Sequence, residues 1–201
     1  MKKDNSTIAQ KIALRQSALR EIESPIIMET HGGYGEIYSR CYSHVERGIV
    51  FEKDEHKSTA LSIQRPTWAV YEGDCVTAIA DGVGAHLKVN YVDVDPYGEP
   101  WPVFDALFGG KASLAMKVAV VVNDGLRQKL KLNGGWSTNS MREAVSRWGN
   151  ENLHDQYLEI CRWLLEKKAA QLGYKLSRWT GYYCGHAKQM THYAATLRRD
   201  G

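Results

Sequence analysis

Two carboxylates, a proline and a tyrosine lie close together in residues 92–100. Asp93 and Asp95 are two residues apart at the end of an apolar, β-rich run, and Pro96 and Tyr97 follow directly. An exocyclic amine needs hydrogen-bond acceptors that orient its lone pair, and its ring needs a flat surface to hold it. Asp95 and the carbonyl of Pro96 are candidate acceptors, and Tyr97 is the candidate surface. A plain strand end with a Pro-Tyr-Gly turn explains the same residues.

A glycine-rich turn precedes this segment. Glu29 ends an apolar run, and His31, Gly33 and Gly35 follow before a helix is expected to begin. Glycines at such a turn let a ligand approach the backbone, although glycine also serves simple tight turns. The turn is therefore a candidate cofactor site at the carboxyl edge of a sheet.

Two further acidic residues end the next two apolar runs. Glu52 lies about 20 residues beyond the turn, where a carboxylate can accept hydrogen bonds from both hydroxyls of a ribose. Asp74 is placed to receive an adenine amino group, but Gly-Asp is also a common turn and helix cap. Both residues indicate a nucleoside-containing cofactor, and a nicotinamide cofactor would use a similar carboxylate.

Short apolar segments alternate with helical ones through much of the chain. The expected strands cover residues 25–30, 47–52, 67–74, 88–96 and 116–124, and the expected helices between them cover 54–64, 75–80 and 100–108. Residues 173–199 hold two β-rich segments around a Gly/His/Lys turn. The pattern predicts an α/β fold: a doubly wound, Rossmann-like sheet that is mostly parallel, with a C-terminal antiparallel hairpin and helices on both faces.

Helical periodicity also appears outside this alternation. Apolar residues recur at helical spacing in residues 1–24, which predicts an N-terminal helical extension. Residues 125–136 predict a short helix closed by Gly134 and Gly135, and two more helices are expected over residues 139–148 and 151–172. With no internal repeat or low-complexity linker, one domain over residues 1–201 is expected.

The composition is that of an ordinary globular protein. The chain has 201 residues, 43% of them hydrophobic and 24% charged, and a net charge of +3. Four widely spaced cysteines and an N-terminus without a secretory apolar segment predict a reduced, cytoplasmic protein. No apolar run is long enough for a membrane span. Cys184, His186 and His192 lack the paired spacing of a zinc site, so no metal is expected.

Two segments of the sequence resemble those of a known family. Residues 93–108, DVDPYGEPWPVFDALF, resemble the DxDPYGSPxPFxDAA segment of the tRNA guanine-N2 dimethyltransferases, and more distantly the D/N-P-P-Y/F motif of enzymes that methylate base amino groups. Glu29 to Gly35 is similar to the E/D-x-G-x-G-x-G motif of class I S-adenosylmethionine-dependent methyltransferases, with His31 at the first glycine. Glu99 replaces the family's serine, and the C-terminal region lacks a counterpart of that family's extra substrate domain.

The resemblance implies a methyltransferase that uses S-adenosylmethionine. Its acceptor would be an amino group of a nucleic-acid base, in RNA sooner than in DNA, with guanine N2 of tRNA as one option. The predicted cofactor-binding residues are Glu29, His31, Gly33, Gly35, Glu52, Asp74 and Asp93, and the predicted catalytic residues are Asp95, Pro96 and Tyr97. A non-catalytic cofactor- or nucleic-acid-binding module stays open, as do a protein or small-molecule amine as acceptor and the oligomeric state.

Basic and aromatic residues near the C-terminus also suggest a nucleic-acid partner. Cations that track phosphates and rings that stack on bases form such surfaces. The candidates, beside the basic N-terminal helix, are Arg178, Trp179, Tyr182, Tyr183, Lys188, Arg198 and Arg199. An ordinary hairpin with amphipathic ends explains them equally well.

Overall fold

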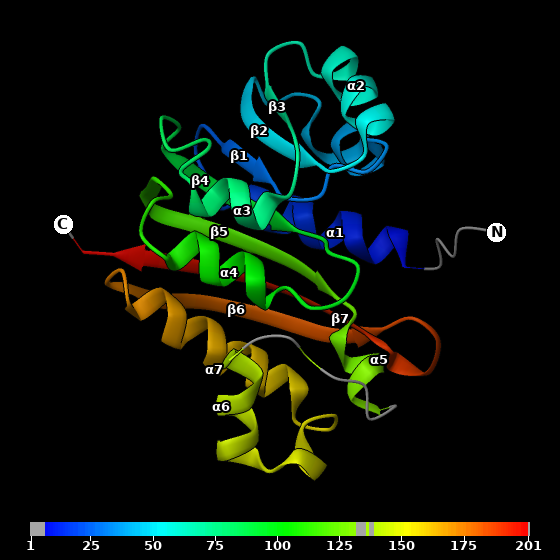
Figure 1. Cartoon of the computed structure of the whole chain (residues 1–201), viewed down its shortest axis with the longest axis vertical. Coiled ribbons are helices and arrows are strands. Elements are labelled where there is room, and N and C mark those ends of the chain that lie inside the picture. The colour runs from blue at the N-terminus through cyan, green and yellow to red at the C-terminus, as the bar shows by residue number, and fades with distance from the viewer. Residues whose placement is uncertain (1–6, 132–135, 137–138, 201) are drawn as a thin grey trace.

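Seven strands form a single sheet in the computed structural model, which describes residues 7–131, 136 and 139–200 (Figure 1). The strands are β1 (Ile26–Glu29), β2 (Arg47–Glu52), β3 (Ala69–Glu72), β4 (Val89–Val94), β5 (Leu114–Asp124), β6 (Tyr174–Cys184) and β7 (Met190–Arg199). Their order across the sheet is β3-β2-β1-β4-β5-β7-β6. The first five strands run parallel, and β7 pairs antiparallel with both β5 and β6. The predicted mostly parallel sheet with a C-terminal hairpin is confirmed.

Most expected helices are present. They are α1 (Ile8–Leu19), α2 (Glu55–Gln64), α3 (Cys75–Ala80), α4 (Trp101–Phe108), α5 (Leu126–Lys131), α6 (Asn139–Trp148) and α7 (Tyr157–Ala170). The expected closing glycines Gly134 and Gly135 lie outside the described residues, as do residues 1–6 of the N-terminal extension. None of the described helices is long and apolar enough to cross a membrane.

Two helical predictions were wrong in detail. The helix expected over residues 151–172 is shorter: Asn150–Asn152 form a separate 3-10 turn, η2, and α7 begins only at Tyr157. The side chain of Asn152 donates to the carbonyl of Trp148 at the end of α6, at 2.7 Å. After the glycine-rich turn, the chain forms a π-helical turn, η1 (Tyr38–Tyr42), in place of a regular helix. π-Helical turns of this kind often lie near functional sites.

Helices pack on both faces of the sheet, because side chains alternate between the faces along each strand. On one face, Ile27, Val50 and Tyr91 pack with residues of α1 and η1. On the other face, their neighbours Met28 and Val92 pack with residues of α3, α4 and α7. The valine-rich centre of β5 is fully buried, as expected of a strand covered on both sides.

The four cysteines are buried, and none forms a disulfide. Burial raises the pKa of the Cys41 thiol to about 11 and that of the Cys75 thiol to about 12. A thiolate is the nucleophilic form of cysteine, so these two thiols are unsuited to nucleophilic chemistry at neutral pH.

Asp124 closes β5 and joins it to the helical layer. Its Oδ1 accepts a hydrogen bond from the backbone N–H of Leu126, and its Oδ2 accepts one from the hydroxyl of Tyr157, each at 2.7 Å. Burial raises the pKa of this carboxyl to about 7, and the hydrogen bond from Tyr157 offsets only part of that effect. The folded protein therefore holds a proton on Asp124 at mildly acidic pH.

We expect the free energy of unfolding to fall as pH rises, because the folded protein binds this proton more tightly than the unfolded chain does. The folded pKa lies above the ordinary value of 3.8, so the contribution of Asp124 is complete below about pH 4 and is lost as pH rises to about 7. Asp124→Asn should remove this loss, which amounts to about 4 kcal/mol at 1.36 kcal/mol per pKa unit. Urea unfolding at several pH values measures it. Asp105→Asn, at an exposed position, is the control, and identical pH profiles for Asp124→Asn and the unmodified protein would contradict the assignment.

Candidate functional site

The carboxyl ends of the parallel strands bring most of the predicted site residues to one edge of the sheet (Figure 1). Glu29, the last residue of β1, lies opposite Val50 of β2 and Asp93 of β4. Glu52 ends β2, and Asp95 follows β4. The glycine-rich turn leaves β1 between them, so the turn and these carboxylates lie at the same edge.

The glycine-rich turn is tied to the strands on either side. The backbone N–H of Gly32 donates to the carbonyl of Phe51 at 3.0 Å, and that of Gly33 donates to Glu52 Oε2 at 2.7 Å. Gly33 and Gly35 have φ values of 55° and 77°, in the left-handed region that glycine adopts readily. A Cβ at Gly33 would meet no atom within 4 Å. The turn is thus rigidly held, with open space at Gly33.

Glu52 and Asp74 reach solvent beside this turn. Glu52 is half-buried, and its Oε1 accepts hydrogen bonds from the N–H groups of Lys53 and Asp54 at 2.9 and 3.0 Å. Asp74 is exposed and caps α3, where its Oδ1 accepts from the N–H of Thr77 at 3.0 Å. That hydrogen bond lowers the pKa of Asp74. Both side chains can accept hydrogen bonds from a ligand.

His31 links the turn to α3. The hydroxyl of Thr30 donates to the carbonyl of Asp93 at 3.1 Å, so it accepts from Nδ1–H of His31, 2.8 Å away. This partner assigns the tautomer and leaves Nε2 facing the Cys75 sulfur at 3.7 Å. Burial lowers the pKa of His31, so the ring is neutral near pH 7. A cofactor contact of His31 stays a prediction.

Glu29 is buried in an ion pair that the sequence did not reveal. Arg65 Nη1 lies 2.5 Å from Glu29 Oε2, and the Arg65 guanidinium lies 4.3 Å from the ring centroid of Tyr38 and 5.2 Å from that of Trp68. Burial raises the pKa of Glu29 even though Arg65 acts in the opposite direction. The carboxylate predicted to position the cofactor is therefore held by Arg65 at the end of β1.

Asp93 is likewise engaged within the protein. Arg15 of α1 donates from Nε to Oδ2 at 2.7 Å and from Nη2 to Oδ1 at 2.8 Å. The hydroxyl of Tyr42 donates to Oδ2 at 2.7 Å. Asp93 is buried and binds Arg15 and Tyr42, so it holds α1 and η1 on the sheet. A cofactor contact of Asp93 stays a prediction.

Asp95 lies at the rim of the same edge. Its side chain is 24% exposed, and Lys11 Nζ and Arg15 Nη2 each lie 3.2 Å from Oδ2. Burial acts to raise the pKa of Asp95, but Arg15 and Lys11 outweigh it and the pKa is lowered. Pro96 is half-buried and Tyr97 is fully exposed. The three predicted catalytic residues thus stay together, with an ionised carboxylate beside an exposed ring.

Two polar residues to which the sequence analysis gave no role lie in the next strands. Asn123 of β5 pairs in register with His192 of β7, and both are fully buried. The side chain of Asn123 interacts with the Asp95 carboxylate, and among the residues that the structure describes neither ring nitrogen of His192 has a hydrogen-bond partner. Burial lowers the pKa of His192 to about 4, so its ring is neutral. The sequence could have identified Asn123 as a candidate functional residue, because it is a polar residue that directly follows the apolar run Val118–Val122.

Several of the predicted nucleic-acid contacts in the hairpin are engaged internally. Trp179 stacks on Tyr193 with ring centroids 5.0 Å apart, and the Arg127 guanidinium lies 3.9 Å from the Tyr183 ring. Arg178 forms an ion pair with Glu21. The Tyr182 hydroxyl donates to the carbonyl of Gln10, and the Arg199 guanidinium lies over the Tyr174 ring. The aromatic members of the set thus pack within the protein, whereas its basic members stay exposed: Arg178, Lys188, Arg198 and Arg199.

No metal-binding cluster is apparent in the part of the chain that the structure describes: no group of three or more His, Cys, Asp or Glu side chains is placed to hold an ion there.

Comparison with known proteins gives matches in structure alone. No protein-family model and no curated protein sequence matches the chain. Trm1 from Pyrococcus horikoshii, solved with S-adenosyl-L-methionine, superposes with a TM-score of 0.71 at 13% identity, covering 99% of this chain and 56% of that one. TYW2 from M. jannaschii, solved with AdoMet, gives 0.62 at 12% identity and coverage of 100% and 79%.

The N-methyltransferase NodS from Bradyrhizobium japonicum WM9 matches over the full length of both chains, 100% of each, with a TM-score of 0.59 and 12% identity. This chain therefore has the Rossmann-like fold of class I S-adenosylmethionine-dependent methyltransferases. It spans 56% of the length of the Trm1 chain.

We expect Arg15→Ala to destabilise the protein by about 3–5 kcal/mol, because it leaves the buried Asp93 carboxylate without its cation. The measurement is the free energy of unfolding in urea. Arg162→Ala is the matched control, since Arg162 pairs with Glu166 on the exposed side of α7 and such pairs contribute about 1 kcal/mol or less. Similar small losses in both variants would show that the Arg15–Asp93 pair does not anchor α1.

Proposed function

We propose that the protein is a single-domain enzyme that transfers a methyl group from S-adenosylmethionine to an amino group of a nucleic-acid base, in RNA sooner than in DNA. One observation carries the proposal. In a chain with the methyltransferase fold, the open turn at Gly33 and the acceptors Glu52 and Asp74 lie at the same sheet edge as Asp95.

The residues at this edge fit the proposed cofactor. A nucleoside offers two ribose hydroxyls and an adenine amino group as hydrogen-bond donors, and Glu52 and Asp74 are solvent-reaching acceptors. Each carboxylate oxygen has two acceptor positions, so Glu52 can keep its bond from Gly33 and still accept another. The open space at Gly33 leaves room for close approach to the backbone. When bound, S-adenosylmethionine supplies an electrophilic methyl group on a sulfonium sulfur.

The residues after β4 would orient the acceptor amine. Asp95, kept ionised by Arg15 and Lys11, accepts an N–H hydrogen bond and directs the nitrogen lone pair toward the cofactor side of the edge. The carbonyl of Pro96 already accepts the N–H of Gly98 at 3.1 Å and has a second acceptor position free for the amine. The exposed ring of Tyr97 offers the stacking surface. Catalysis then rests on holding two reactants in register.

The choice of acceptor rests on residues 93–108. Their likeness to the DPYG segment of base-methylating enzymes and the exposed Tyr97 ring support a base. The full-length match to the N-methyltransferase NodS supports a second candidate, a methyltransferase of another kind of amine. Both candidates use the same cofactor edge.

Glu52→Ala should weaken S-adenosylmethionine binding by about 10- to 100-fold, because it removes a charged acceptor whose hydrogen bonds contribute about 1.5–3 kcal/mol. Isothermal titration of the pure protein measures the affinity. Glu55→Ala, three residues on and exposed at the start of α2, is the matched control and should change little. If the protein binds NAD and ignores both the methyl donor and its demethylated product, the proposed cofactor is wrong.

Asp95→Ala should lower methyl transfer by about 100-fold or more, because a misplaced acceptor loses the reactive geometry. The affinity for the cofactor should fall little, since Asp95 acts on the acceptor. The assay uses labelled S-adenosylmethionine with pooled RNA, DNA and protein, and Asp81→Asn, at an exposed position after α3, is the control. An equal loss of cofactor binding would reassign Asp95 to the cofactor site. If only protein or a metabolite is labelled, the acceptor is not a nucleic acid, but the protein is still a methyltransferase.

A further inference from the structure

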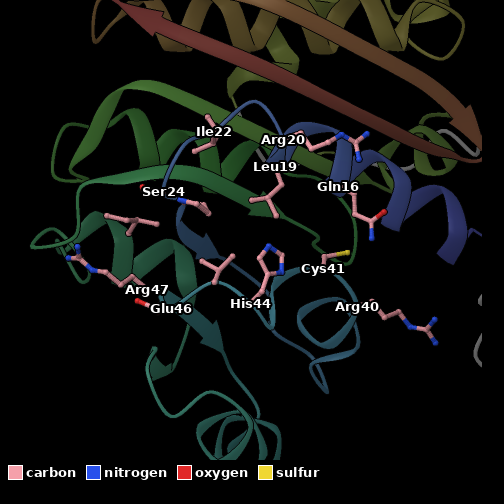
Figure 2. A pocket seen from close by; sticks show the side chains of 13 residues that line it. Gln16, Leu19, Arg20, Ile22, Ser24, Arg40, Cys41, His44, Glu46 and Arg47 are labelled. Carbon is pink, nitrogen blue, oxygen red and sulfur yellow. The ribbon is translucent and has the colours of Figure 1, made fainter.

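A groove of about 840 Å³ lies on the α1 face of the sheet, at the edge where β1 and β2 begin. Figure 2 shows its lining side chains between α1 and the turn that follows η1. This edge is opposite the one that holds Glu52 and Asp95, because parallel strands start at one edge and end at the other. The groove is therefore separate from the site described above.

The floor of the groove is apolar. Leu19 and Ile22 come from α1 and the residues that follow it, and Val45 comes from the turn before β2. Each of the three is at most 9% exposed. A flat, uncharged group would lie on this floor without losing hydrogen bonds to water.

The rim of the groove is basic. Arg20, Arg40 and Arg47 lie along it, and all three side chains and that of His44 are exposed. Figure 2 shows His44 between Arg40 and Arg47, whose guanidinium groups extend outward on opposite sides. Arg40 pairs with Glu36 at 3.3 Å and stays 53% exposed, whereas Arg20 and Arg47 form no ion pair with any residue that the structure describes. Glu46 is the single carboxylate among the described lining residues.

Guanidinium groups around an apolar floor match the chemistry of a nucleotide. Arginine donates paired hydrogen bonds to phosphate oxygens, and a base or ribose covers apolar surface. We propose that this groove binds the sugar-phosphate chain of the RNA substrate, at a distance from the base that is methylated. The inference rests on the proposed function, because it assumes that the acceptor is RNA.

Helix α1 connects the groove to the acceptor edge. Lys11 and Arg15 hold Asp95 near one end of the helix, and Arg20 reaches the groove at the other. Arg20 is nine positions after Lys11, which is about 14 Å along the helix at 1.5 Å per residue. A strand of a few nucleotides spans that length. The aromatic residues of the hairpin are half-buried and contact other residues of the protein, whereas the groove combines exposed cations with an apolar floor.

The test compares two double charge reversals in the full chain. Arg20→Glu/Arg47→Glu alters the groove, and Arg162→Glu/Lys175→Glu makes the same change in net charge on exposed side chains of α7 and β6. Binding of pooled tRNA is measured at several salt concentrations. The groove variant should bind at least about tenfold more weakly, and the slope of log K against log salt should become shallower by about 1.4, as expected for two lost phosphate contacts on a single strand.

Three further readouts separate the groove from the methyltransferase edge. In the groove variant, KM for RNA should rise while kcat is kept, and S-adenosylmethionine affinity and thermal unfolding should match those of the control variant. If the groove variant binds and methylates RNA as the control variant does, the groove is not an RNA-binding site, and the proposed function is unaffected. If the groove variant loses binding to anionic lipid vesicles but still binds RNA, the proposed RNA-binding role of the groove is also wrong. Failure of the unmodified protein to bind or methylate RNA would overturn both proposals.

Discussion

Two carboxylates, Glu29 and Asp93, face each other across β1 and β4 in the interior of the protein, and each is matched by one buried arginine. Like charges at this spacing disfavour ionisation, and burial adds a further cost. Arg65 and Arg15 offset that cost by direct ion pairs. The arrangement ties three distant pieces of chain to the carboxyl edge: α1 through Arg15, the segment after α2 through Arg65, and η1 through Tyr42.

This constraint divides the acidic residues of the edge into two groups. Glu29 and Asp93 are buried and hold the scaffold, whereas Glu52, Asp74 and Asp95 reach solvent and have acceptor capacity left for ligands. Position along the strand does not explain the divide by itself, because Glu29 and Glu52 each end a strand. Glu29 differs in that Arg65 packs over it and buries it.

Helix α1 contacts both the carboxyl edge of the sheet and the basic groove at the opposite edge. Its Lys11 and Arg15 neutralise Asp95, and its C-terminal part forms one wall of the basic groove. Beside it, Asn123 of β5 and His192 of β7 are fully buried and pair in register.

The sequence by itself determined the sheet and the edge at which its chemistry gathers. Apolar runs such as Val118–Val122 predicted strands, their alternation with helices predicted parallel pairing, and the ends of those runs predicted where Glu52, Asp74 and Asp95 lie. These features depend on local patterns of a few residues. Only the tertiary structure decided which carboxylates are buried beneath an arginine and which reach solvent, because the arginine partners are remote in sequence. Arg15 is 78 residues from Asp93, and Arg65 is 36 from Glu29. No local pattern encodes such pairs, since they form only when separate elements pack against the same strand ends.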